Sequence, residues 1–548
     1  MHTEKIIALV NASIALGQQH RHTEALACLD QAIALNRDFF LLFANKGSVL
    51  AAMGRHTEAL ACFDYVLNLK PDIVQVVQAR KWSIDAALAG CDQALVVNPE
   101  NTSIRYQRGV LLHKLERVDE ALACQDAVLE AEPHHIGALT ERGTLLFTLN
   151  RMDAALACYT QLLALSQTTP AAFAVALFNL ANAEQKTGQI VLALEHYRQA
   201  AESVPTLLEA KVEQAHCQLR LGNFVQAWPL YESRWGTPQL SAKYLLTPAP
   251  QWRGDGSLVA KTILLWDEQG LGDTIQFVRY VAVVAQLAQY VILRVPESLC
   301  TVLQTLVGLD GVAMTNLCII SHQQVLPAHD MQCPLMSLPL ALGAAFQCIP
   351  AHLDSLKMAS YLHADEYRAT SLNATEPRTI QASQRGLRIG LVWSGQQHPH
   401  NPTRDIPLEL LIPLTRLKGE FVSLQKNVSE QELILLNSLH IRCLPVDAMA
   451  DFAATAAVIT QLDLVISVDT AVAHLAAAMG KPTWILLRCS GEWRWMQDRT
   501  DSVWYPSVRL FRQSVHGDWD GVVASVYEEI ASVSEVTGVA GVTKSHSS

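Results

Sequence analysis

The stretch "FANKGSVLAAMGRHTEALACFDYVLNLKP" (residues 43–71) decides the fold of the first part of the chain. Its segment "TEALAC" starts at Thr57 and also at Thr23, and the variants "DEALAC" and "DAALAC" start at Asp119 and Asp153. Two of the three intervals between these segments are 34 residues long, and the third is 62. Self-similarity at such a period marks supersecondary units that bury their apolar faces against their neighbours. The sequence therefore predicts a stack of helix pairs.

The period and its signature positions resemble the tetratricopeptide repeat. Gly47 and Ala59 lack bulk, so two antiparallel helices can approach each other closely at these positions. Phe63 is expected to fill the gap between the helices, and Pro71 to stop the second helix. We predict an all-α superhelix of about seven such units over residues 1–236.

One repeat unit, near residues 74–98, is shorter than the others. Only 28 residues separate Pro71 from Pro99, so we predict that this unit has lost part of its first helix. Stacked helix pairs leave a concave surface, which usually binds a peptide or another protein. We therefore expect a protein or peptide partner in the groove of the repeats.

Composition excludes several classes of partner and site. The 548-residue chain has a net charge of −11 and no dense basic run, so we expect no nucleic-acid partner. No uncharged apolar run approaches about 18 residues and no signal peptide is visible, so we expect a cytoplasmic protein without an integral membrane segment. The twelve cysteines form neither CxxC pairs nor Cys/His clusters, which predicts buried thiols and no metal site. Four of them share one position of the repeats: Cys28, Cys62, Cys124 and Cys158.

A different pattern begins after residue 236. Pro and Gly in "TPAPQWRGDGS" indicate a linker over 237–260, after which strand and helix patterns alternate, as in parallel α/β sheets. We predict two Rossmann-like halves, 261–384 and 385–535, joined through the polar stretch 373–385, and a disordered tail over 536–548. Strands are predicted at 261–266, 290–296, 387–395, 420–426, 462–468, 483–487 and 507–513, and helices at 273–288, 297–306, 406–417, 429–439, 451–462, 471–479 and 519–533. The carboxyl ends of the strands would face the cleft between the halves.

Two loops at strand ends carry the candidate chemistry. The loop "DEQGLGD" (267–273) lacks the Lys and Ser/Thr of a Walker loop and the third glycine of a dinucleotide fingerprint. Its last residue, Asp273, is either a helix cap or a general base. The loop "DTAVAH" (469–474) follows a strand and opens a helix whose free N–H groups would attract phosphate. His474 is either a packed neutral histidine or a phosphate donor.

These segments carry a family resemblance. "GLGDTIQFVRY" (270–280), "GLVWSG" (390–395) and "LDLVISVDTAVAHLAAAMGKPTWILL" (462–487) resemble the heptosyltransferase family of metal-independent, inverting GT-B glycosyltransferases. With "LYESRW" (230–235) ahead and "WRWMQDRTDSVWYPSVRLFRQ" (493–513) behind, the chain resembles bacterial tetratricopeptide-repeat proteins with a heptosyltransferase-like carboxyl-terminal domain. The resemblance implies a GT-B pair of Rossmann-like domains, with the acceptor on the first half and a nucleotide-diphosphate sugar on the second.

The resemblance also implies roles for individual residues. Asp273 corresponds to the catalytic base, and the donor diphosphate would lie on Thr470, the amide of Ala471 and His474, with Asp469 near the sugar. Ala471 stands where the family usually has glycine. No cofactor and no metal is implied, so a cation must balance the departing phosphate. The expected donor-binding residues are Gly272, Ser394, Gly395, Arg404, Lys426, Asp469, Thr470, Ala471 and His474, with Arg404 or Lys426 supplying that cation. Trp393, Trp493 and Trp495 either stack on the ligand or belong to the core.

The favoured hypothesis is a glycosyltransferase that moves a sugar from a nucleotide-diphosphate sugar to an acceptor hydroxyl, with inversion. The acceptor hydroxyl would lie on a protein bound by the repeats, a layout similar to that of protein O-GlcNAc transferases. The alternative is a non-catalytic scaffold or nucleotide-sugar-sensing protein with a GT-B-like domain. A lipid-linked glycan acceptor ranks below both.

Overall fold

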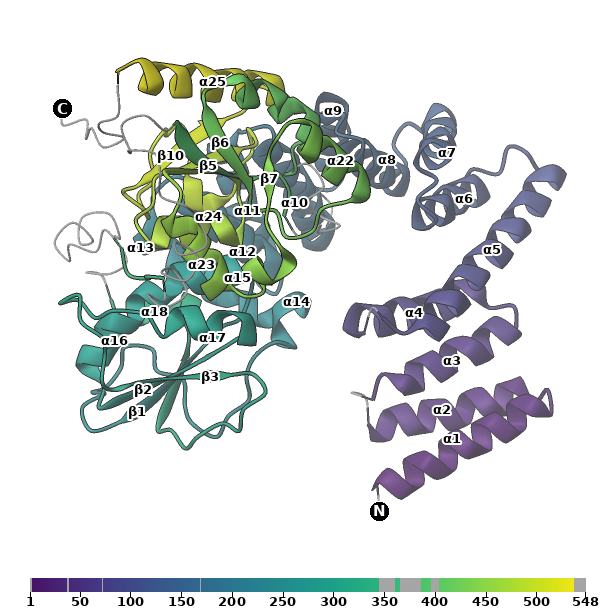
Figure 1. Ribbon diagram of the computed structural model, residues 1–548. Helices are drawn as coiled ribbons and strands as arrows, with labels where there is room; N and C mark the ends of the chain where they lie inside the picture. The colour runs from purple at the N-terminus through teal and green to yellow at the C-terminus, as the bar shows by residue number, and fades with distance from the viewer. Residues whose placement is uncertain are drawn as a thin grey trace. The chain divides into compact units, whose positions relative to one another are not determined.

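The computed structural model describes residues 2–36, 39–70, 72–167, 169–343, 360–364, 386–395 and 404–536 (Figure 1). The chain divides into two compact units, residues 1–184 with 202–204 and residues 185–201 with 205–548. Three predictions concern residues outside this description: the helix stop at Pro71, the polar stretch 373–385, and the tail 536–548 beyond Val536. No helix within the described ranges is long and apolar enough to cross a lipid bilayer.

The first unit consists of helices joined by short turns, and neighbours in sequence pack against each other. Apolar stripes on these helices bury side chains such as Phe63, Leu112 and Tyr159. The helices are α1 (His2–Gln18), α2 (His22–Leu35), α3 (Leu41–Ala52), α4 (His56–Leu69), α5 (Val74–Val97), α6 (Thr102–Lys114), α7 (Val118–Ala131), α8 (Ile136–Thr148), α9 (Met152–Leu165) and α10 (Pro170–Lys186), whose last residues belong to the second unit.

Glycine sets the distance between the two helices of a repeat. A Cβ on Gly47 of α3 would lie 2.6 Å from the ring of Phe63 on α4, and a Cβ on Gly143 of α8 would lie 2.5 Å from the ring of Tyr159 on α9. Carbon atoms attract each other at about 3.5–4.0 Å and repel at these shorter distances. The prediction that Gly47 permits a close approach and that Phe63 fills the gap is confirmed.

The short repeat unit forms one uninterrupted helix, α5 (Val74–Val97), of 24 residues. Its first half carries Arg80, which pairs with Asp64 of α4 at 2.5 Å, and its second half carries Asp92, which pairs with Arg108 of α6 at 2.7 Å. Both pairs span 16 residues, as do Lys46–Asp30 and Arg142–Asp126 in neighbouring repeats. This single helix therefore makes the contacts that two separate helices make in the other units.

The second unit begins with the end of the helical region and continues into a four-stranded parallel sheet of order β3-β2-β1-β4. Its helical part contains α11 (Ile190–Ser203), α12 (Leu208–Arg220), α13 (Phe224–Tyr231), η1 (Glu232–Gly236) and α14 (Pro238–Ser241). The sheet contains β1 (Thr262–Trp266), β2 (Tyr290–Val295), β3 (Leu317–Ser321) and β4 (Met331–Pro334), with α15 (Leu271–Phe277), η2 (Val278–Tyr280), α16 (Val281–Leu287), α17 (Glu297–Leu303), η3 (Leu335–Ser337) and α18 (Leu338–Ala341). The strand order reverses at β1.

A second parallel sheet of six strands follows, in the order β10-β9-β8-β5-β6-β7. Figure 1 labels its strands β5, β6, β7 and β10. Its strands are β5 (Leu387–Val392), β6 (Gly419–Ser423), β7 (Arg442–Cys443), β8 (Leu464–Val468), β9 (Thr483–Leu487) and β10 (Val508–Arg512). Its helices are η4 (Leu408–Arg416), α22 (Glu430–Ser438), η5 (Val446–Met449), α23 (Phe452–Thr460), α24 (Ala471–Ala478), η6 (Trp493–Trp495) and α25 (Trp519–Val536). The strand order reverses between β5 and β8, where ligands bind in open α/β sheets.

The predicted fold class, repeat helices followed by two parallel α/β sheets, is confirmed. The segment 406–417 differs from its prediction, because it forms the 3₁₀ helix η4 instead of an α-helix. Pro407 precedes η4 and Pro413 lies inside it, and proline removes a donor that an α-helix needs. The sequence analysis also missed the short strands β3, β4 and β7. The limits predicted for the individual domains stay predictions.

An aromatic cluster joins the last helical repeat to the sheets of the second unit. Trp228 of α13 lies 6.1 Å from Phe277 and 6.0 Å from Trp493, ring centroid to ring centroid. Trp493 and Trp495 are 5% and 1% exposed, and Trp393 is 1% exposed. Of the two interpretations of these three tryptophans, the buried-core one therefore holds.

Candidate active site

Asp273 lies in the first turn of α15, which follows the carboxyl end of β1 after the loop 267–270. Its Oδ2 accepts a hydrogen bond from the backbone N–H of Gly270 at 2.7 Å, which caps the helix. Its Oδ1 forms an ion pair with the guanidinium of Arg494. The carboxylate therefore has one oxygen in a capping bond and the other against a cation.

Arg494 belongs to η6 and is almost completely buried. Its Nε donates to Oε1 of Gln276 at 2.8 Å, and its guanidinium lies over the Trp493 ring at 4.3 Å from the centroid. Burial lowers the pKa of Arg494, but the charges of Asp273, Glu492 and Asp469 outweigh burial and raise it above its ordinary value. Arg494 thus remains a cation between the Asp273 helix and the Asp469 loop.

The second loop follows β8 and caps α24. Thr470 is the N-cap: its Oγ1 accepts from the backbone N–H of Ala473 at 3.3 Å and lies 2.9 Å from Oγ of Ser467. Within the described ranges, the N–H groups of Ala471 and Val472 at the start of α24 have no backbone acceptor, so they favour an anion. Ala471 is the first residue of α24 and is half-buried.

His474 is 4% exposed and both of its ring nitrogens have neighbours. Nδ1 lies 2.8 Å from the hydroxyl of Tyr505, and Nε2 lies 3.6 Å from Oδ1 of Asp469. The imidazole also stacks on Trp495, with ring centroids 5.2 Å apart. Burial by itself raises the pKa of Asp469, but the hydrogen bond and charge of His474, with the charge of Arg494, hold it below its ordinary value. The arrangement makes Asp469 a carboxylate and His474 the group that orients it.

Gly272 brings the two loops together. A Cβ at this position would lie 2.9 Å from Cδ2 of His474 and 3.7 Å from Cα of Ala471. The start of α15 can therefore approach the start of α24 only with glycine here. Sequence analysis assigned Gly272 to donor binding, and the structure gives it this packing contact.

The remaining predicted residues line the ends of other strands of the second sheet. Gln425 follows β6. Its Oε1 accepts a hydrogen bond from the backbone N–H of Ser394 at 3.1 Å, and its Nε2 donates to Oγ of Ser394 at 2.7 Å. The N–H of Gly395 donates to Oδ1 of Asp405 at 2.9 Å, and the guanidinium of Arg404 lies against Gly395. Lys426 is exposed, and no contact joins it to the Asp273–His474 group within the described ranges.

Arg488 and Arg494 are cations that sequence analysis missed. Arg488 is the first residue after β9, so its place at a strand end is a signal that could have found it. Burial lowers the pKa of Arg488, the charge of Arg404 lowers it further, and the carboxylates of Glu492 and Asp469 raise it. The charges of Arg404, Glu492 and Asp469 therefore all act on Arg488.

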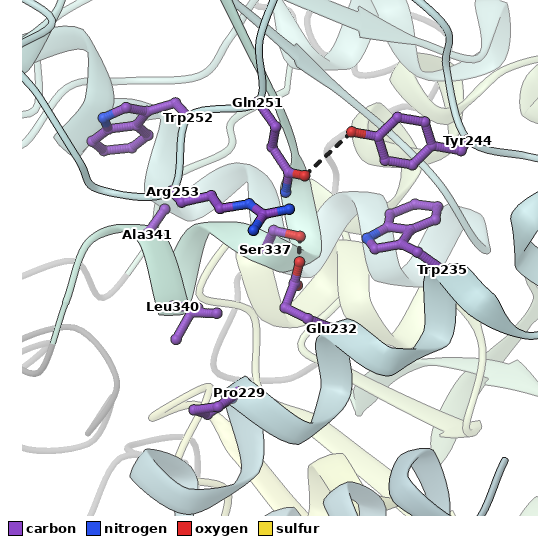
Figure 2. Close-up of a pocket in the computed structure, with 10 residues that line it drawn as sticks. All are labelled: Pro229, Glu232, Trp235, Tyr244, Gln251, Trp252, Arg253, Ser337, Leu340 and Ala341. Atoms are coloured by element: carbon purple, nitrogen blue, oxygen red, sulfur yellow. Dashed lines mark hydrogen bonds between the residues drawn. The ribbon is translucent and has the colours of Figure 1, made fainter. Parts of the chain in front are cut away.

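A cavity of 390 Å³ lies beside the first sheet (Figure 2). The Trp235 and Tyr244 rings meet edge to face on its wall, 4.8 Å apart, and the Tyr244 hydroxyl donates to Oε1 of Gln251 at 3.2 Å. Figure 2 also shows the hydrogen bond that the Ser337 hydroxyl donates to Oε1 of Glu232 at 2.7 Å. The residues that line this cavity are Pro229, Glu232, Trp235, Tyr244, Gln251, Trp252, Arg253, Ser337, Leu340 and Ala341. Sequence analysis placed no site here.

A buried ion pair lies next to this cavity. Arg234 is fully buried, and its Nε and Nη2 donate to the two carboxylate oxygens of Glu268 at 2.8 and 3.0 Å. Nη2 also donates to Oγ of Ser337 at 2.8 Å, and the backbone N–H of Met336 donates to Glu268 at 2.9 Å. Glu268 comes from the loop that leads to Asp273, so this pair fixes that loop to the end of the helical repeats.

Comparison with known proteins finds matching segments in both parts of the chain. The profile of glycosyltransferase family 9 (heptosyltransferase) matches residues 424–495, which include the 469–474 loop and Arg494 but not Asp273. Tetratricopeptide-repeat profiles match residues 10–72, 102–135 and 140–207.

One curated relative and two solved structures illustrate the similarity. Protein FlbA of Caulobacter vibrioides (strain ATCC 19089 / CIP 103742 / CB 15) is 25% identical over 377 residues, which cover 66% of this chain and 62% of FlbA. This chain therefore spans less than two thirds of that relative. The crystal structure of MamA is 17% identical with a TM-score of 0.27, covering 31% of this chain and 98% of MamA. A tetratricopeptide-repeat protein from Parabacteroides merdae ATCC 43184 is 16% identical with a TM-score of 0.26, covering 42% of this chain and 91% of that protein.

The repeat helices of the fold agree with the repeat profiles, and the second sheet holds the segment of the glycosyltransferase profile. The chain joins tetratricopeptide repeats to a domain of the glycosyltransferase family 9 (heptosyltransferase) type.

Proposed function

We propose that the protein is an inverting, metal-independent glycosyltransferase that uses a nucleotide-diphosphate sugar. One observation carries this proposal: Asp273 and the 469–474 loop, each at a strand-order reversal of a parallel sheet, meet at Arg494. A carboxylate, an anion-binding helix start and a cation are the groups that such a transfer needs.

In this proposal, Asp273 takes the proton of the acceptor hydroxyl as the hydroxyl oxygen attacks the anomeric carbon. The bond between that carbon and the diphosphate oxygen breaks, and the nucleoside diphosphate leaves from the opposite face. Thr470 and the first amides of α24 bind the diphosphate, while Arg494, Arg488 and Arg404 balance its charge. Lys426, exposed at the end of β6, is a further candidate cation.

In this proposal, Arg494 makes donor binding precede the activation of Asp273. While it pairs with Asp273, its guanidinium occupies Oδ1, the oxygen that the proton of an acceptor hydroxyl would have to reach. An arriving diphosphate competes for the same guanidinium, and its two phosphates are the stronger attraction. We propose that donor binding draws Arg494 away and thereby activates Asp273.

The acceptor is proposed to be a protein hydroxyl. The repeats support this, because a superhelix of this kind offers a concave surface for an extended polypeptide. Binding of such a polypeptide by the repeats would raise its effective concentration at the transferase domain.

The test is sugar transfer by the full chain with ADP-, UDP-, GDP- and dTDP-sugars, after a thermal-shift screen for the donor that binds. Asp273→Asn should reduce turnover by about a hundredfold or more, as expected for loss of a general base, while donor binding is retained or tighter, because the donor no longer competes with a carboxylate for Arg494. The matched control is Asp267→Asn, because Asp267 lies in the same loop and pairs with His322 instead, at 2.6 Å.

A scaffold or nucleotide-sugar sensor is the second candidate, and the Asp273–Arg494 ion pair favours it, since the guanidinium occupies the carboxylate oxygen that would accept the proton. Donor binding without product for any acceptor, unaffected by Asp273→Asn, would establish this candidate and refute the first.

A further inference from the structure

A second cavity, here called the α11 cavity, has a volume of 530 Å³ and lies at the start of α11. Its walls are residues 188–192, the end of α12 and the loop 496–499. Within the described ranges, none of the residues that we assign to donor binding lines this cavity. Its volume falls within the range of roughly 300–1,000 Å³ that small-molecule sites occupy.

Arg220, the last residue of α12, lines the α11 cavity and is only 5% exposed. Its Nε has no hydrogen-bond partner within the described ranges, and burial lowers the pKa of Arg220 although the charges of Cys217 and Glu492 raise it. A buried, unpaired charge is costly and is normally neutralised by a partner. The helix dipole stabilises a cation at the carboxyl end of α12, but that interaction does not require the cation to be buried.

A second arginine lies close behind the first. Arg512 has Nε and Nη1 without partners in the described ranges, while its Nη2 donates to the backbone oxygens of Trp495 and Met496 at 3.1 and 2.8 Å. Burial lowers the pKa of Arg512 to about 10, and the neighbouring charge of Arg220 contributes to that shift. The two guanidinium charges repel each other, so an anion beside Arg220 would lower the electrostatic cost of burying both side chains.

The first turn of α11 faces the same cavity. Ile190 N–H donates to the oxygen of Gly188 at 2.9 Å, whereas the N–H groups of Val191 and Leu192 have no acceptor within the described ranges. α11 has 14 residues, so its amino-terminal end carries the full partial positive charge of a helix. Free amides and a guanidinium together are the donors that proteins present to phosphate.

We propose that the α11 cavity binds the phosphate group of a small phosphomonoester, held by Arg220 and the free amides of α11. The remaining volume would take the organic part of the ester, against apolar side chains such as Leu221 and Met496.

Two other charges line the cavity and limit its ligand. Asp498 is an exposed carboxylate on the wall, and Arg499 is half-buried and pairs with Asp501 at 2.6 Å. Asp498 disfavours a ligand with several phosphates, because each additional negative charge is repelled. A single phosphate on an uncharged body therefore fits better than a diphosphate.

The test uses the full chain in phosphate-free buffer with phenyl phosphate, inorganic phosphate and phenol as probes. Calorimetry measures affinity, and hydrogen–deuterium exchange of residues 188–193 reports the place of binding, separately from the donor loop at 469–474. Phenyl phosphate should bind more tightly than inorganic phosphate and slow exchange at 188–193, and phenol should do neither.

Variants decide whether Arg220 is the phosphate ligand. Arg220→Gln should weaken phenyl phosphate about tenfold or more, as expected for losing a charge-assisted hydrogen bond. It should not lower the melting temperature without phosphate, since it removes an unpaired buried charge. Arg220→Lys should weaken binding less, and it supplies the same comparison if Arg220→Gln fails to fold. The control Arg499→Gln should bind as the wild type does.

Equal affinity of the wild type and Arg220→Gln, or unchanged exchange at 188–193 with millimolar phenyl phosphate, would overturn the proposal. Inorganic phosphate binding as tightly as phenyl phosphate would overturn the assignment of an ester. The outcome does not depend on sugar transfer, because none of these measurements uses a glycosyl donor.

Discussion

Replacing Gly272 by alanine should destabilise the protein, although the same replacement in most helices has the opposite effect. Alanine at a helix position is usually about 0.5–1 kcal/mol more stable than glycine, because it loses less conformational entropy on folding. At Gly272 the new Cβ would lie 2.9 Å from Cδ2 of His474, and the glycine needs no unusual backbone conformation. Steric repulsion must therefore exceed this gain for the replacement to destabilise the protein.

The size of the effect follows from how firmly His474 is held. A comfortable carbon–carbon contact is about 3.5–4.0 Å, so the helices must separate by roughly 0.6–1 Å. His474 cannot yield easily, because Tyr505, Trp495 and Asp469 contact it on separate sides. Overpacking of this kind costs about 1–3 kcal/mol. A displacement of about 1 Å between catalytic groups can lower turnover about a hundredfold.

Urea unfolding measures the stability change and sugar transfer measures the catalytic one. The control is Gly90→Ala in α5, because a Cβ at Gly90 would meet nothing within 4 Å and should stabilise the helix. If Gly272→Ala were as stable as the wild type and as active, the two loops would not be in the contact described, and the active-site geometry would be refuted.

Three further predictions concern the repeats, the buried ion pair and pH. Gly47→Ala should destabilise the repeats by about 1–3 kcal/mol through its clash with Phe63, seen as faster hydrogen exchange in α3 and α4. Arg234→Met should cost about 3–5 kcal/mol in urea unfolding, because it leaves the buried Glu268 carboxylate unpaired; adding Glu268→Gln should recover part of the loss. Asp469 has a folded pKa below its ordinary 3.8, so its stabilisation is complete above that value and is lost as pH falls through the folded pKa. Melting curves of Asp469→Asn should therefore depend less on pH between about 5 and 2 than those of the wild type.

The fold could be predicted to a large extent because its signals are local. The repeat period, and glycine opposite an aromatic ring at Gly47 and Phe63, follow from sequence spacing alone. Strands such as β1 and β8 were visible as apolar runs that end in loops. The strand β7 has only two residues, so it shows no periodicity that could be detected. The apolar residues of η4 recur at the spacing of an α-helix, so this segment was predicted as one despite its prolines.

The candidate site could be predicted only in part, because its decisive contacts are long-range. The sequence singled out Asp273 and the 469–474 loop separately, since each follows a strand. Arg494 was missed because its partner Asp273 lies 221 residues away, and nothing in "WRWMQD" indicates an ion pair. The role of Gly272 was also out of reach, because only the structure brings His474 against it.

The two interpretations of Asp273 from the sequence, helix cap and general base, do not exclude each other. Its Oδ2 accepts a hydrogen bond from the backbone N–H of Gly270, and this bond fixes the carboxylate plane at the start of α15. Its Oδ1 meets Arg494, and this is the oxygen that would become available for a proton if the donor drew that guanidinium away. Because the capping bond can persist while Oδ1 changes partner, a single carboxylate can hold the helix throughout and act as a base only when donor is bound. The capping bond therefore positions the proposed base and is no argument against it.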